Sequence, residues 1–119
     1  MAKNGDVTIF HNPNCGTSRA VLAALKDAGR SPKVVEYLKA GWTKPQLRGL
    51  LAQMHAKPRD ILRTRGTNAE ALGLTKPGAG DDAILDAMVA EPILVERPIV
   101  VTPKGAALCR PADRLQALL

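Results

Sequence analysis

One cysteine stands in a polar segment that links a short apolar run to a helix-like pattern. Cys15 lies within residues 11–19 (HNPNCGTSR), and a run rich in alanine, valine and leucine follows. A cysteine at a helix N-terminus meets unpaired backbone N–H groups and the positive end of the helix dipole, which favour the thiolate. His11 and Arg19 are close enough in sequence to contribute, and Ser18 can donate a hydrogen bond to the sulfur. The segment therefore predicts a nucleophilic thiol.

The alternative for Cys15 is a small buried cysteine at a strand end, which is a common place for this residue. Its polar neighbours Asn12, Asn14 and Thr17 favour exposure instead. The stretch C-G-T-S also has the spacing of the redox motif C-x-x-C, but Ser18 occupies the second position. Because no internal disulfide can form there, the thiol must act alone or with a resolving thiol from elsewhere.

Two arginines far from Cys15 in sequence are brought together by a predicted hairpin. Thr102 and Gly105 flank a type I turn, and this turn sets Arg97 directly opposite Arg110. Like charges that face each other on a sheet repel, whereas arginine binds tetrahedral oxyanions through paired hydrogen bonds. The alternative is two solvated arginines, and a register shift of one residue would separate them. The pair is therefore a candidate oxyanion site.

Other residues of reactive type have simpler interpretations. Cys109 should point to the opposite side of the strand from its arginine neighbour, into the core. Pro98 is a candidate for a cis peptide bond. In the arginine-rich segment 59–65 either Arg63 or Arg65 could reach a site, and the spacing does not choose between them. The two histidines and two cysteines are too widely scattered to indicate a metal site.

The two ends of the chain are predicted to supply a sheet and two helices. Periodicity and turn signals place, in chain order, a strand at 7–10, a helix at 17–28, a strand at 33–38, a strand at 99–101, a strand at 106–110 and a helix at 111–119. The first three elements form a βαβ unit, whose crossover connection favours parallel pairing of its strands.

The segment between these ends is predicted to be mostly helical. Thr43 begins a capping box with Gln46, and leucines at helical spacing follow. Further signals indicate a short helix at 58–62, a second capping box at 67–70, and a helix capped by Asp81 or Asp82 that ends before Pro92.

This order of elements is that of an α/β fold: a thioredoxin-like sheet of about four strands with an enlarged helical insertion at about 43–91. A chain of 119 residues is long enough to bury a core without disulfides, so we expect a single domain over residues 1–119.

Composition narrows the classes of partner. The net charge of +6 attracts anions of any size. Only three residues are aromatic, which argues against a base-stacking platform, and we expect no nucleic-acid partner. No apolar run approaches the roughly 20 residues of a membrane span, and residues 1–6 lack a signal-peptide core. We therefore expect no membrane partner and a cytoplasmic location.

Two blocks of the sequence resemble the glutaredoxin-linked arsenate reductase family, whose fold is thioredoxin-like. They are HNPNCGTSR at 11–19, and the C-terminal pair RPIVVTP and LCRP that contains Arg97 and Arg110. The resemblance implies an enzyme that reduces arsenate to arsenite. It implies that Cys15 is the nucleophile, forming a cysteinyl–arsenate adduct, and that Arg63, Arg97 and Arg110 bind the oxyanion.

The resemblance also assigns supporting residues and partners. His11 and Ser18 match the residues that favour the thiolate. Glutathione is implied as co-substrate and glutaredoxin as protein partner. We expect no bound cofactor, and the scattered histidines and cysteines indicate no metal. Two alternatives belong to other classes: a regulator that binds RNA polymerase, as Spx-type proteins do, and a glutaredoxin-like monothiol reductase. Ser18 removes the C-x-x-C switch that the regulators often carry, and the reductase leaves the paired arginines unused unless they bind glutathione carboxylates.

Overall fold

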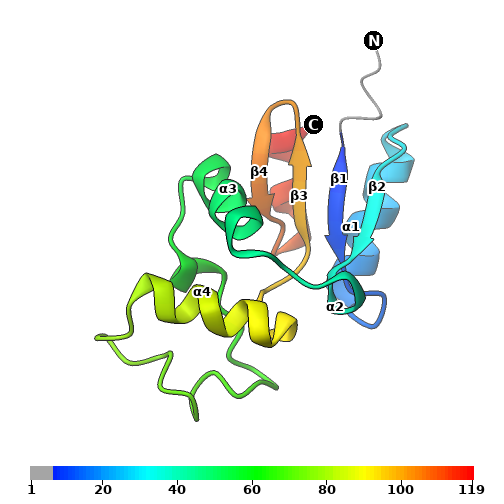
Figure 1. Ribbon diagram of the computed structural model, residues 1–119. Helices are drawn as coiled ribbons and strands as arrows, with labels where there is room; N and C mark the ends of the chain where they lie inside the picture. Colours follow the sequence, from blue (N-terminus) through cyan, green and yellow to red (C-terminus); the bar gives the residue numbers. More distant parts are fainter. Residues whose placement is uncertain (1–6) are drawn as a thin grey trace. The chain divides into compact units, whose positions relative to one another are not determined.

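The computed structural model describes residues 7–119, which form two compact units (Figure 1). Residues 7–40 and 97–119 make the first unit, and residues 41–96 make the second. Residues 1–6, in which the sequence lacks a signal-peptide core, lie outside the described residues. In the described part of the chain, no helix is long and apolar enough to cross a membrane.

The first unit is built on a four-stranded sheet with the order β2-β1-β3-β4 (Figure 1). Its strands are β1 (Thr8–His11), β2 (Lys33–Glu36), β3 (Ile99–Thr102) and β4 (Gly105–Leu108). β1 and β2 pair in parallel, and helix α1 (Gly16–Asp27) connects them. β3 pairs antiparallel with both β1 and β4. The predicted βαβ unit, the hairpin and the α/β class are confirmed.

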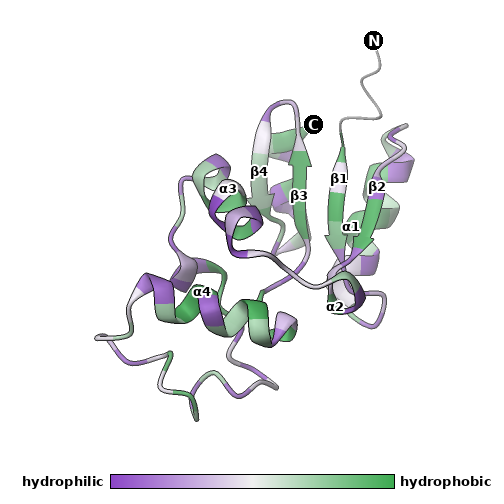
Figure 2. Cartoon of the chain, viewed as in Figure 1, coloured by the Kyte–Doolittle hydropathy of each residue, from purple (hydrophilic) through white to green (hydrophobic). Residues whose placement is uncertain are grey.

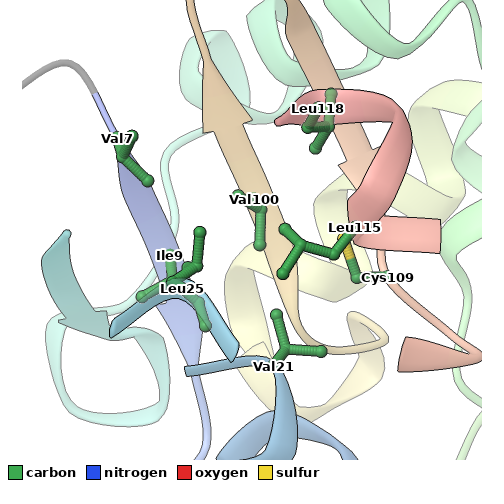
Figure 3. Packing of buried hydrophobic residues seen from close by; sticks show 8 residues of the cluster. All are labelled: Val7, Ile9, Val21, Leu25, Val100, Cys109, Leu115 and Leu118. Atoms are coloured by element: carbon green, nitrogen blue, oxygen red, sulfur yellow. The ribbon is translucent and has the colours of Figure 1, made fainter. Parts of the chain in front are cut away.

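One face of this sheet is covered by α1 and by the C-terminal 3-10 helix η4 (Ala112–Leu118). The buried residues that meet there are Val7, Ile9, Val21, Leu25, Val100, Cys109, Leu115 and Leu118 (Figure 3). Hydropathy follows this packing, since β3 is largely hydrophobic and α1 carries both kinds of residue (Figure 2). Full burial of each large aliphatic side chain contributes about 1.5–3 kcal/mol, so this cluster anchors the helix whose N-terminus carries Cys15.

The second unit contains two longer helices, α3 (Lys44–Met54) and α4 (Asp81–Ala90), and two short 3-10 helices, η2 (Pro58–Ile61) and η3 (Pro92–Leu94). The capping box before α3 is confirmed. Thr43 Oγ1 accepts from the Gln46 N–H at 3.2 Å, and Gln46 Oε1 accepts from the Thr43 N–H at the same distance. The α4 helix is also confirmed, but Gly80 is its N-cap, and the two aspartates lie in its first turn.

Two predicted elements before the C-terminal hairpin differ in the structure. The strand at 33–38 ends at Glu36, because Tyr37 begins a one-turn helix, α2 (Tyr37–Ala40), and buries its ring completely. The capping box predicted at 67–70 is wrong, because residues 65–78 form turns and bends rather than a helix. Thr67 Oγ1 donates to the Arg63 carbonyl at 2.7 Å and accepts from the Ala69 N–H, which stabilises a turn.

The C-terminal elements are shorter than predicted. β4 ends at Leu108 rather than at residue 110, and the last helix is a 3-10 helix that begins after Pro111. Thr102 Oγ1, at the end of β3, donates to the Leu118 carbonyl at 3.0 Å. This buried hydrogen bond ties the end of the last helix to the sheet.

Candidate active site

Cys15 is the N-cap residue of α1, as the sequence predicts. Its backbone is extended (φ −102°, ψ 123°), its N–H donates to the Asn12 carbonyl at 3.0 Å, and its own carbonyl accepts from the Arg19 N–H at 2.9 Å. The thiol therefore lies at the end of the helix where backbone N–H groups have no intrahelical acceptor.

The side chain of Cys15 is more enclosed than predicted. Only 9% of the residue is exposed, whereas its polar neighbours in the sequence favoured an open position. Asn12 explains part of the difference, because it is itself buried and turns its side chain inward to accept from the Asn14 N–H at 3.0 Å. The polar residues are thus used to fold the loop around the cysteine.

Burial and hydrogen bonding act on the Cys15 thiol in opposite directions. Burial raises the pKa, but hydrogen bonds outweigh it and lower the pKa from an ordinary value of 9.0 to about 7. The groups that lower it are, in order of effect, the Ser18 backbone N–H, the Arg97 side chain, the Arg110 side chain and the Thr17 backbone N–H. A large fraction of Cys15 is therefore thiolate at neutral pH.

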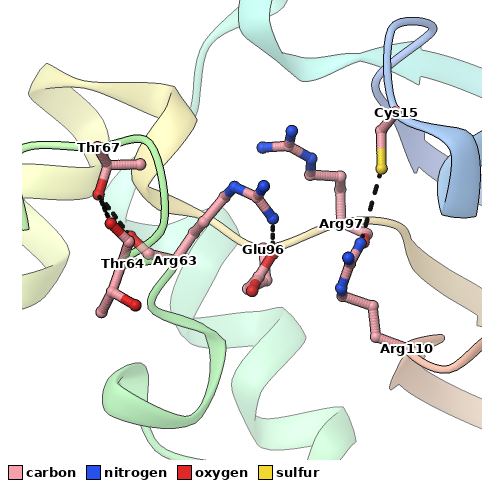
Figure 4. Close-up of polar contacts among 7 residues, drawn as sticks. All are labelled: Cys15, Arg63, Thr64, Thr67, Glu96, Arg97 and Arg110. Carbon is pink, nitrogen blue, oxygen red and sulfur yellow. Dashed lines mark hydrogen bonds and ion pairs between the residues drawn. The ribbon is translucent and has the colours of Figure 1, made fainter.

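Arg110 links Cys15 to the segment before β3 (Figure 4). Its Nη1 lies 3.6 Å from the Cys15 sulfur and donates to the Arg97 carbonyl at 3.0 Å. The same guanidinium nitrogen thus stabilises the thiolate and is fixed by a backbone oxygen. A positive charge at this distance favours the ionised sulfur.

Arg97 has buried N–H donors without an acceptor among the described residues. The residue is 9% exposed, and its Nε and Nη1 have no hydrogen-bond partner in the part of the chain that the structure describes. A buried guanidinium N–H without an acceptor is costly. An oxyanion beside Cys15 would supply acceptors for these donors and offset the charge.

The predicted register of the hairpin is confirmed, but the two arginines meet in a different way. Ile99 pairs with Leu108 and Thr102 with Gly105, as the turn required. The paired strands end there, so Arg97 and Arg110 lie beyond the ladder and contact through the side chain of one and the carbonyl of the other. The Arg97–Pro98 peptide bond is cis, as is Arg110–Pro111.

His11 and Ser18 form a buried pair behind the loop. His11 Nδ1 lies 2.6 Å from Ser18 Oγ, which also accepts from the Asn12 N–H at 3.1 Å. Burial lowers the pKa of His11 from its ordinary value, which favours the neutral imidazole. The predicted hydrogen bond from the Ser18 hydroxyl to the sulfur is wrong. The backbone N–H of Ser18 contacts the thiol, whereas the hydroxyl is hydrogen-bonded to His11.

Arg19 and Cys109, which the sequence also offered as residues of interest, form no hydrogen bond with the Cys15 thiol. Arg19 donates to the Pro13 carbonyl at 2.9 Å, which stabilises the loop before α1. It is not among the groups that lower the pKa of Cys15. Cys109 is completely buried, and burial raises its pKa to about 11. The prediction that Cys109 belongs to the core is confirmed, and it remains a thiol at neutral pH.

Comparison with known proteins identifies the family. The model of the ArsC family matches residues 10–118. The chain belongs to the ArsC family. Arsenate reductase ArsI2 of Synechocystis sp. is 54% identical over 113 residues, which cover 95% of this chain and 81% of that protein. Arsenate reductase of Escherichia coli K12 is 41% identical over 114 residues, covering 96% and 81%.

Solved structures confirm the thioredoxin-like fold of this ArsC chain. The structure of arsenate reductase from Vibrio cholerae superimposes with a TM-score of 0.89 at 35% identity, covering 95% of this chain and 97% of that one. The resemblance drawn from the two sequence blocks is therefore shown, and so is the fold class.

Arg63, the third arginine that the resemblance to the family implies, belongs to the second unit. Its Nη1 donates to Glu96 Oε1 at 2.7 Å, and only 12% of its side chain is exposed (Figure 4). Sequence reasoning missed Glu96, because a lone glutamate beside Arg97 carries no spacing signal of its own. Among the described residues, no group of three or more His, Cys, Asp or Glu side chains is arranged to hold a metal ion.

Proposed function

We propose that this protein is an arsenate reductase whose nucleophile is the Cys15 thiolate. The observation that carries the proposal is the contact of Cys15 with Arg110, beside a nine-tenths buried Arg97 that has two unpartnered donors. A nucleophile and an anion-binding group in one place suit attack on a tetrahedral oxyanion. The names of its relatives at 41–54% identity support arsenate as that oxyanion.

The arginines bind the substrate before the chemical step. Arg97 and Arg110 donate to arsenate oxygens and offset the charge that the anion brings beside the thiolate. Arg63 is the third arginine that the family resemblance implies. His11 and Ser18 act through the loop: the Ser18 hydroxyl connects His11 to the Asn12 N–H, which fixes the segment that ends in Cys15.

The reaction moves two electrons from sulfur to arsenic. The Cys15 thiolate attacks As(V), an As–O bond breaks, and the oxygen leaves as water after protonation. The glutathione thiol then replaces a second oxygen on arsenic, again releasing water. Glutaredoxin attacks the glutathione sulfur, so that a mixed disulfide forms and the electron pair remains on arsenic as As(III). Hydrolysis releases arsenite and regenerates Cys15.

The test is production of arsenite by the purified protein with glutathione, glutaredoxin and arsenate. We expect arsenite from the wild type, none above background from Cys15→Ser, and wild-type rates from the matched control Cys109→Ala. Equal background rates in the wild type and Cys15→Ser would refute the proposal. Turnover of a glutathione mixed disulfide, equal with and without arsenate, would support the monothiol reductase instead.

A further inference from the structure

Asn12 begins the turn that leads from β1 to Cys15, and it is buried although its side chain is polar. Only 4% of the residue is exposed, whereas the next two residues, Pro13 and Asn14, are exposed. Loop residues normally lie on the surface, and burial of a polar side chain is costly unless its polar atoms find partners. The buried position of Asn12 therefore needs a further reason.

Three hydrogen bonds connect Asn12 to the residues on which the thiol depends. Its backbone carbonyl accepts from the Cys15 N–H at 3.0 Å, and its side-chain Oδ1 accepts from the Asn14 N–H at 3.0 Å. Its own N–H donates to Ser18 Oγ, in the first part of α1, at 3.1 Å. Asn12 thus restrains Cys15, the residue before it and the helix after it.

The side-chain contact restrains the backbone just before the cysteine. In this arrangement the amide oxygen of Asn12 takes the place of a backbone carbonyl and accepts from the N–H two residues further on. Pro13 adds its own fixed φ at the next position. The torsions of residues 13 and 14 decide how the chain enters Cys15. Asparagine supplies this acceptor without a negative charge, which would disfavour a nearby thiolate.

The direction of the Cys15 sulfur matters because its hydrogen-bond donors come from two places. The N–H groups of Thr17 and Ser18 belong to α1, whereas Arg110, whose Nη1 lies 3.6 Å from the sulfur, follows β4. Hydrogen bonds weaken steeply when the donor and the acceptor are poorly aligned. The sulfur can therefore use both sets of donors only if the backbone of Cys15 keeps one conformation.

We propose that Asn12 is a positioning residue, which holds the turn before α1 so that the Cys15 sulfur faces Arg110 and the oxyanion. This inference rests on the proposed function, because that function makes Cys15 the nucleophile. Asn12 acts through the backbone of Asn14 and Cys15 rather than by contact with the substrate. A nucleophile that is held in its reactive direction needs no further ordering before it attacks.

The decisive measurement is the pH profile of Cys15 alkylation by iodoacetamide. We expect Asn12→Ala to move the midpoint from about 7 toward 9.0, because the sulfur is no longer aligned with its donors. Asn12→Ser keeps an uncharged oxygen that accepts from the same N–H more weakly, so its midpoint should lie between those of the wild type and Asn12→Ala.

Two results would overturn the inference. They are a midpoint in Asn12→Ala no higher than that of the wild type, and a midpoint in Asn12→Ser as high as that of Asn12→Ala. If Asn12→Ala does not fold, Asn12→Ser decides alone: a midpoint above the wild-type value supports the positioning role, and a midpoint equal to it rejects that role.

Two control variants separate positioning from a general loss of stability. Asn14→Ala removes an exposed side chain from the same turn but keeps the backbone N–H that donates to Asn12. Thr43→Ala removes the same kind of contact in the other unit, a side-chain oxygen that accepts from a backbone N–H. Both controls should keep the midpoint at about 7, and urea unfolding verifies that each variant is folded. A shift in Thr43→Ala equal to that in Asn12→Ala would contradict a positioning role.

Turnover distinguishes this inference from the proposed function. With arsenate, glutathione and glutaredoxin, Asn12→Ala should lower kcat about ten- to a hundredfold and leave the KM for arsenate unchanged, because the arginines bind the substrate. A higher KM with an unchanged kcat would speak against positioning of the nucleophile. Absence of arsenite from the wild type rejects arsenate reduction, while the alkylation profiles still decide the role of Asn12. Turnover that depends on Cys15, combined with alkylation profiles that ignore Asn12, rejects only the positioning role.

Discussion

The Cys15 thiol is ionised by groups that are distant in sequence, against the effect of its own burial. The Ser18 and Thr17 N–H groups come from the helix start, whereas Arg97 and Arg110 come from the segments that flank the β3–β4 hairpin. Because the guanidinium groups act on sulfur and would also act on a bound oxyanion, the proposed nucleophile and the proposed anion site share the same two side chains.

Removal of the Arg110 guanidinium should change the pKa of Cys15. Since its guanidinium lowers the pKa of Cys15, Arg110→Ala should raise that pKa from about 7 toward the ordinary value of 9.0. The rate of alkylation by iodoacetamide, measured from pH 5 to 10, reports the thiolate fraction. Cys109→Ala is the control, because the buried Cys109 should not react in this range. An unshifted profile in Arg110→Ala would contradict the assigned contact.

The hydroxyl of Ser18 should matter for stability more than for thiol ionisation. It is fully buried and hydrogen-bonded to His11 and to the Asn12 N–H, whereas the Ser18 backbone N–H donates to the Cys15 sulfur. Ser18→Ala should therefore reduce the free energy of unfolding by about 1–3 kcal/mol, measured by urea denaturation. The midpoint of the alkylation profile should stay near pH 7. A rise as large as that in Arg110→Ala would instead support a hydroxyl–sulfur contact.

At the scale of elements, local signals predicted the structure where local contacts decide it. The capping box of Thr43 and Gln46 needs only neighbouring residues and is present. The similar signal at 67–70 failed, because the Thr67 hydroxyl bonds to the Arg63 carbonyl and supports a turn. The hairpin register followed from its turn, and with it the meeting of Arg97 and Arg110.

The place of Cys15 in the fold was predicted, but the contacts of its sulfur atom were not. Cys15 at the helix start is a matter of sequence order, and so was predictable. Which Ser18 group faces the sulfur depends on the buried position of His11, which periodicity does not encode. Glu96 was missed because its partner is 33 residues away in the chain, and only the folded bridge between their segments brings them together.

The capping box of α3 offers a test of a single element. Thr43→Ala removes the acceptor for the Gln46 N–H and half of the reciprocal pair. The loss of an N-cap residue typically reduces stability by about 1 kcal/mol, so the urea midpoint should fall accordingly. Gln46→Ala removes the other half alone and should have a smaller effect. An unchanged midpoint in Thr43→Ala would show that α3 is held by its buried leucines rather than by its cap.

At the scale of the whole molecule, the two thiols give stability opposite dependences on pH. The pKa of Cys15 is about 7 in the folded protein and 9.0 as its ordinary value, so the unfolded chain binds more protons between these values. Its contribution to stability is therefore fully present above pH 9 and is lost as the pH falls through 7. Cys109 is reversed: burial raises its pKa to about 11, so its contribution is present below pH 9 and is lost as the pH rises toward 11.

A comparison of variants with the wild type should show both pH dependences in the free energy of unfolding. Between pH 6.5 and 9, the wild type should gain on the order of 2 kcal/mol relative to Cys15→Ser, because each unit of pKa difference is worth about 1.4 kcal/mol. Cys109→Ala should keep this rise but lose the thiol-dependent fall above pH 9. Subtraction between proteins removes every other titrating group, so urea denaturation at four pH values isolates each thiol. A difference between wild type and Cys15→Ser that is flat with pH would mean that the guanidinium groups and helix N–H groups do not stabilise the thiolate of the folded protein.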